Sequence, residues 1–284
     1  MSKTQILNGY INRIASLNDQ LWYFLFTSEE LNRQLSNFTD KAKENYTIDL
    51  FKNNVYAPQI HVKTIELPKF QRDNKHQTFG AYFSTCYEIS SNYFKDVFDT
   101  LKSFNSLRSY NWDRNLEPEK NLINLLAHES LPLIPVEILD TYTYLRLRRN
   151  HFTHLSTSPN PRMLRHIAAN GYNLNTYWRS KDAIRVLDFT NIAIEAFTQD
   201  ETIELIKILR ICLNEIDAHI ASLIKIDSII EYIVKREYSA QNTRINHLVL
   251  RQRNKKIIRL LLMEFNITVL ESKIIPFTST IGIK

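Results

Sequence analysis

The scarcity of glycine and proline constrains the fold of this chain more than any other feature. Its 284 residues include only four Gly and eight Pro, while long segments are rich in Leu and Ile. An all-β fold or a glycine-rich nucleotide-binding fold needs more tight turns than these residues provide. With 44% apolar residues, the chain can bury a sizeable core. We therefore expect a globular, all-α protein.

Apolar residues recur with helical spacing along most of the chain. Long helices are expected at 5–36, 77–103, 136–155 and 201–236, and shorter ones at 117–128, 161–169, 181–197 and 243–264. Residues 53–74 break the pattern and are compatible with a short strand or β-hairpin, followed by a polar surface loop at 71–77. Residues 267–283 are rich in β-branched side chains and are expected to be extended. We expect a helical domain with insertions over 1–236, then a basic helix and extended tail over 237–284.

Cysteine usage and the length of the apolar runs allow a prediction of where the protein is located in the cell. Cys86 and Cys212 lie far apart in apolar helical contexts, so cysteine alone builds neither a disulfide framework nor a zinc site. No apolar, uncharged run reaches about 18 residues, and the N-terminus does not resemble a secretion signal. We expect a cytoplasmic protein that does not interact with a membrane.

The positive charge is concentrated in two acid-free stretches. The first lies between Asp140 and Asp182 and contains seven cationic residues, with aromatic residues interleaved. Such a stretch favours a surface that attracts phosphate and stacks on bases. The residues expected to contact RNA there are Arg162, Arg165, Tyr177, Trp178, Arg179 and Lys181. The second acid-free stretch lies between Glu237 and Glu264. It is as compatible with a solvated helix face as with a phosphate-binding surface.

Within the first stretch, Arg149-Asn150-x-x-x-His154 supplies the groups that cleave a phosphodiester without a metal. Histidine can act as a general base or acid because its ordinary pKa lies near neutrality. Arginine does not titrate, so its role is to bind phosphate and stabilise developing negative charge. Asn150 and His154 are four residues apart and share a helix face. The chemistry predicted for this site is RNA cleavage by attack of the ribose 2′-hydroxyl.

These residues resemble the R-N-x-x-x-H form of the R-x(4 to 6)-H signature of the HEPN (higher eukaryote and prokaryote nucleotide-binding) domain family. The resemblance covers about residues 1–236 and implies an antiparallel helical bundle. It implies a metal-independent endoribonuclease without a cofactor, whose active site forms across a homodimer. In that scheme Arg149 binds the scissile phosphate, Asn150 positions groups and His154 is the acid or base. It also implies a toxin or an abortive-infection effector in antiviral defence, held in check by an antitoxin or regulatory protein.

Other assignments of the same segment remain open. Arg146 with His151, and Arg148 with His154, also satisfy the spacing, so these additional residues are candidates to support the site. For His151 the alternative is a side chain that simply faces solvent. Glu88 is a weak candidate for a buried partner of the arginines. A metal bound by His151 and His154 is disfavoured by the neighbouring cations. The alternative function is a non-catalytic HEPN-like scaffold or regulator that binds nucleic acid or nucleotide.

Overall fold

Every regular element in the described part of the chain is a helix. The computed structural model describes residues 4–104, 110–154, 159–194, 197–238, 247–265 and 267–279. Within these ranges the strand-like pairing is limited to an isolated antiparallel bridge between Tyr46 and Lys63. The same ranges contain no helix that is long and apolar enough to cross a lipid bilayer. The expected all-α class is therefore confirmed.

The helices form two compact units. The first unit contains residues 1–12, 88–143 and 208–284, and the second contains 13–87 and 144–207. Four long helices each contribute a segment to both units: α1 (Gln5–Ser36), α5 (Leu67–Phe104), α7 (Val136–Thr153) and α9 (Gln199–Leu223).

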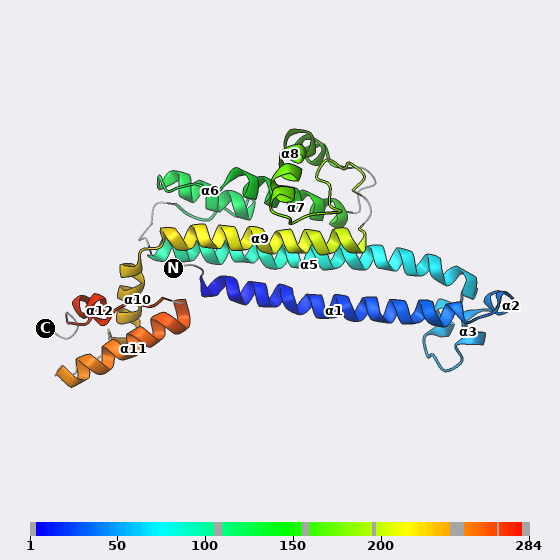
Figure 1. Ribbon diagram of the computed structural model, residues 1–284, viewed down its shortest axis with the longest axis horizontal. Coiled ribbons are helices and arrows are strands. Elements are labelled where there is room, and N and C mark those ends of the chain that lie inside the picture. Colours follow the sequence, from blue (N-terminus) through cyan, green and yellow to red (C-terminus); the bar gives the residue numbers. More distant parts are fainter. Residues whose placement is uncertain are drawn as a thin grey trace. The chain divides into compact units, whose positions relative to one another are not determined.

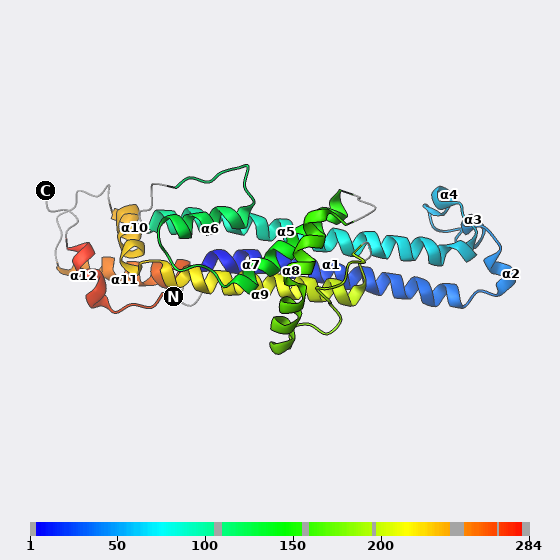
Figure 2. The same ribbon diagram turned by 90° about the horizontal axis from the view of Figure 1, so that it is seen from above.

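In the second unit, the segments of α1 and α5 lie side by side and run in opposite directions (Figures 1 and 2). The Gln71 amide donates a hydrogen bond to the Ser28 carbonyl oxygen at 2.7 Å, which fixes the pairing of the two helices. The side of α1 that faces this core has buried residues every seven positions, as in a coiled-coil seam. These residues are Ile14, Leu21, Ser28 and Leu35. The short helices between α1 and α5 are α2 (Asp40–Lys43), α3 (Thr47–Leu50), α4 (Ala57–Ile60) and the 3-10 helix η1 (Thr64–Glu66).

The second unit also contains α8 (Pro161–Ser180), which runs across the direction of α1 and α5 (Figure 2). The expected helix at 161–169 is therefore too short, and α8 continues through Gly171 to Ser180. A Cβ atom at Gly171 would lie 2.6 Å from the backbone oxygen of Phe189. Glycine is present because another segment of backbone packs directly against this turn.

The first unit contains α6 (Pro118–His128) and a C-terminal group of helices. The buried Asp217 carboxylate accepts hydrogen bonds from the Thr4 backbone and hydroxyl and from the Tyr93 hydroxyl. Helices α10 (Ile226–Tyr238), α11 (His247–Phe265) and α12 (Glu271–Thr278) contact one another. The domain boundary expected at residue 236 thus falls inside α10, within this group.

Several expectations about local structure are wrong. Residues 71–77 are helical rather than a loop, because α5 begins at Leu67 and Pro68 occupies its first turn, where no amide proton is needed. The expected hairpin at 53–74 is replaced by α4 and η1. The periodic run 201–236 is two helices, α9 and α10. The described tail forms α12 because Ile274 and Thr278, four residues apart, are buried on one face. Tertiary packing overrides the β-branched composition there.

The expected helix at 181–197 is also wrong. Its described residues are irregular, although Ala183, Ile184, Leu187, Phe189 and Ile194 are buried. The spacing that suggested an amphipathic helix therefore belongs to an irregular segment that packs its apolar side chains into the second unit.

Candidate functional site at the end of α7

The motif lies where α7 ends, in the second unit. Helix α7 ends at Thr153, and the His154 backbone amide donates to the Asn150 carbonyl at 3.0 Å. The Thr153 hydroxyl donates to the Arg149 carbonyl at 3.1 Å. These bonds hold the last helical turn closed up to His154. Its imidazole is exposed, and among the described residues none shares a hydrogen bond or ion pair with it.

Arg149 and Asn150 are brought together directly. An Arg149 guanidinium nitrogen donates to the Asn150 side-chain oxygen at 3.0 Å, and both side chains are half-buried. An arginine has five N–H donors in a planar guanidinium, a geometry suited to binding a phosphate. In this structure the Asn150 amide oxygen orients Arg149.

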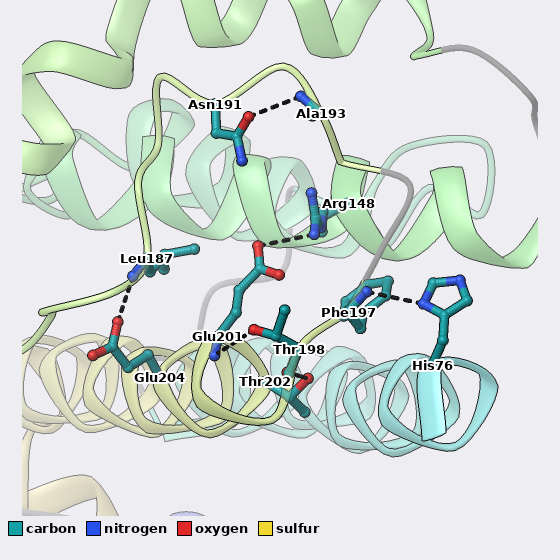
Figure 3. A network of polar contacts seen from close by, with 10 residues as sticks. All are labelled: His76, Arg148, Leu187, Asn191, Ala193, Phe197, Thr198, Glu201, Thr202 and Glu204. Atoms are coloured by element: carbon teal, nitrogen blue, oxygen red, sulfur yellow. Dashed lines mark hydrogen bonds and ion pairs between the residues drawn. The ribbon is translucent and has the colours of Figure 1, made fainter. Parts of the chain in front are cut away.

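Arg148 belongs to the core. Its side chain is 1% exposed, its guanidinium donates to Glu201 at 2.9 Å, and it lies over the Phe197 ring at 4.7 Å. Figure 3 shows Arg148 on α7 and Glu201 on α9 pointing toward each other. Burial raises the pKa of the Glu201 carboxyl, and the Arg148 charge opposes this effect. Solvent does not reach Arg148, so its guanidinium is not exposed to a phosphate in this structure.

The other residues expected to support the site differ in burial. Arg146 is half-buried, and His151 is buried at 6% exposure. Glu88 is exposed, and the carboxylate that pairs with Arg148 is that of Glu201. In the described ranges no three His, Cys, Asp or Glu side chains are grouped so that they could hold a metal ion.

Phe152, between Asn150 and His154, anchors the helix end against α5. Its ring fills the space beside Gly80, where an added Cβ would lie 2.2 Å from a ring carbon. It also packs edge-on against His76 and Phe197, with ring centroids 6.4 and 5.4 Å away. Phe197 is held in turn by its backbone amide, which donates to the His76 Nδ1 at 2.9 Å (Figure 3). The position of the motif is therefore set by contacts with α5 and with the irregular segment.

The irregular segment is secured by the first turns of α9. The Glu204 carboxylate accepts three consecutive backbone amides, from Arg185 at 2.8 Å, Val186 at 3.0 Å and Leu187 at 2.6 Å. Figure 3 shows the Leu187 bond. One charged side chain thus satisfies the amides that a helix would otherwise have satisfied.

A second polar anchor joins the same segment to α8. Asn175 donates to the Asp188 carboxylate at 2.6 Å and accepts from the Phe189 amide at 3.0 Å. Hydrogen bonds from Thr190 and Asn175 lower the pKa of Asp188. The sequence does not reveal Glu204 as the partner of the irregular segment, since an acidic residue early in α9 indicates only a helix start.

The residues expected to contact RNA differ in their exposure to solvent. Arg162, Arg165 and Arg179 are exposed on α8, whereas Trp178 is fully buried and is a core residue. Tyr177 is half-buried, and the Lys181 ammonium lies 4.6 Å from its ring centroid.

Comparison of the chain with protein-family models, curated proteins and solved structures finds no match. The resemblance to HEPN domains therefore remains a prediction that depends on the motif.

Proposed function

We propose that the protein is a metal-independent endoribonuclease of HEPN type, with Arg149, Asn150 and His154 as its catalytic residues. The observation that carries the proposal is that two neighbouring arginines near the end of α7 have different environments. Arg148 is buried and paired with Glu201. Arg149 is held by Asn150 in the last turn of α7, and the His154 imidazole is exposed directly after that turn. This gives a fixed cation and a titratable group at one helix end, with no acidic residue between 141 and 181.

The reaction proposed for this site is transesterification. His154 accepts the proton of the ribose 2′-hydroxyl, and the 2′-oxygen attacks the phosphorus. Arg149 stabilises the added negative charge on the phosphorane. The bond from phosphorus to the 5′-oxygen breaks, and that oxygen takes a proton. The products are a 2′,3′-cyclic phosphate and a 5′-hydroxyl.

Protonation of the leaving oxygen requires an acid as well as a base. Each chain has one motif histidine, so a second acid is available if another copy contributes its own His154. We therefore include a homodimer with a composite active site in the proposal. Its biological role would be that of a toxin or abortive-infection effector, restrained by an antitoxin or another regulatory protein.

The test is an RNA cleavage assay in EDTA with wild type, Arg149→Ala and His154→Ala. Each substitution should reduce the rate by roughly 100-fold or more, as expected for general acid–base and charge-stabilising groups. His128→Ala is the matched control, because His128 is also exposed at the end of a helix, α6, and should leave the rate unchanged. Cleaved RNA should carry cyclic phosphate ends.

Retained cleavage by either motif variant, or dependence on added metal, contradicts the proposal. RNA binding without cleavage by any form supports instead the alternative of a non-catalytic scaffold. The dimer is tested by dilution, since a composite site loses activity per chain when the copies separate. Growth arrest on expression, absent with His154→Ala, tests the toxin role.

A further inference from the structure

The exposed face of α8 has the features of a nucleic-acid surface. The helix contains no acidic residue over its 20 residues. Its buried side packs into the second unit through Met163, Ile167, Gly171, Leu174, Asn175 and Trp178. The opposite side has exposed residues within an arc of about 100° on an ideal helix. The larger side chains among them are Arg162, Arg165, Tyr172, Thr176 and Arg179, and the small residues Pro161, Ala169 and Ser180 lie in the same arc.

Three of these side chains are evenly spaced along the helix. Arg165, Tyr172 and Arg179 are seven residues apart, so an aromatic ring lies between two cations at intervals of roughly 10 Å. Tyr172 is 78% exposed, which leaves its ring face accessible. A solvent-exposed aromatic of this size is not explained by packing within the chain.

The charge of this face is only slightly compensated. Arg179 contributes to the lowered pKa of Asp188, so that carboxylate lies within its electrostatic reach. The same carboxylate already accepts hydrogen bonds from Asn175 and Thr190. The Arg165 guanidinium donates to the Pro161 carbonyl, which is a neutral partner. Both arginines therefore retain a net positive charge toward solvent.

We propose that this face of α8 binds unpaired RNA, with a base stacked on Tyr172 and backbone phosphates bound by Arg165 and Arg179. Stacking on an aromatic ring requires a base with an exposed face, which a duplex does not offer along its length. The proposal rests on the ribonuclease assignment for its choice of RNA, and it narrows the substrate class to single strands. Helix α8 begins seven residues after His154, so the surface and the motif belong to the same segment of chain.

The test measures binding apart from cleavage, in the His154→Ala background, by fluorescence anisotropy. The probes are a labelled single strand of mixed sequence and a duplex of the same length. Tyr172→Ala should weaken single-strand binding roughly tenfold, while Tyr172→Phe should retain it, since the ring is what stacks. Tyr23→Ala is the matched control, because Tyr23 is 70% exposed on α1 and should not affect binding.

Substitution of both Arg165 and Arg179 by alanine should weaken binding to both probes and reduce its dependence on salt. Unchanged single-strand affinity in Tyr172→Ala, or an equal loss for the duplex, overturns the proposal. So does the absence of RNA binding by the His154→Ala parent. If the parent binds through Tyr172 but the wild type never cleaves, the surface stands and the ribonuclease assignment fails.

Discussion

The two neighbouring arginines of α7 should respond oppositely to substitution. Arg148→Met should destabilise the protein strongly, because it leaves the Glu201 carboxylate desolvated without its cation. The Arg148 side chain is 1% exposed and that of Glu201 is 14% exposed, so water compensates little for the loss. Arg149→Met, one residue away, removes a half-buried side chain and should abolish RNA cleavage with a smaller loss of stability than Arg148→Met.

The expected magnitude follows from this burial. Removing one member of a buried ion pair costs about 3–5 kcal/mol. A typical domain is stable by about 5–15 kcal/mol, so Arg148→Met removes a large fraction of the free energy of unfolding. Arg149→Met should cost less than Arg148→Met, because the Arg149 side chain is half-buried whereas that of Arg148 is 1% exposed.

A double substitution isolates the ion pair. Arg148→Met combined with Glu201→Gln removes both charges, so it should be more stable than Arg148→Met alone by about 2 kcal/mol. Lowering the pH should have a similar effect on Arg148→Met. Burial raises the folded-state pKa of Glu201 above its ordinary 4.5, so protonation favours the folded state as the pH falls. The stability lost by Arg148→Met should therefore shrink in acid.

Urea unfolding followed by far-ultraviolet circular dichroism measures these differences. The reasoning is refuted if Arg148→Met and Arg149→Met unfold at the same urea concentration. It is also refuted if the double variant is no more stable than Arg148→Met, because Glu201 would then not depend on the cation.

Two further predictions concern the anchors of the site. Hydrogen bonds from Thr190 and Asn175 lower the pKa of Asp188, so the stability that its ionised carboxylate contributes is lost as the pH falls below the ordinary 3.8. The Asp188→Asn variant lacks this titrating group, so acid should reduce its stability by up to about 1 kcal/mol less than that of the wild type. Acid unfolding curves measure the difference. Gly80→Ala should lower stability by about 1–3 kcal/mol, because its Cβ would meet the Phe152 ring, despite the better helix propensity of alanine. Thermal unfolding should show that Phe152→Leu partly restores the Gly80→Ala variant, and a Gly80→Ala variant as stable as wild type contradicts the contact.

Local sequence is sufficient to predict the helices whose apolar spacing is regular. The expected helix at 5–36 matches α1, and 117–128 matches α6 to within one residue. The expected helix at 136–155 matches α7 up to its end, which places the motif at a helix terminus as the sequence predicts. In these segments the buried stripe and the helix period agree.

The prediction of a helix at 181–197 fails for a physical reason. Its apolar residues mimic an amphipathic helix, but its amides bond to Glu204, some 17 to 19 residues further along the chain. A pattern search within a short window does not detect such a partner. The pairing of Arg148 with Glu201, 53 residues apart, is hidden in the same way. Consequently, the sequence alone does not distinguish the buried Arg148 from its half-buried neighbour Arg149.

The Gly80 and Phe152 contact has an evolutionary consequence. It links two positions separated by 72 residues, 152 minus 80, so that a larger residue at the first requires a smaller one at the second. Glycine in a helix interior is disfavoured by about 1 kcal/mol relative to alanine, and drift alone would tend to remove it. Relatives that share this fold should keep a small residue in α5 opposite an aromatic one within the motif. This coupled pair, together with Arg149 and His154, defines a set of residue types at characteristic separations along the chain. Such a set can identify relatives when overall sequence similarity is lost.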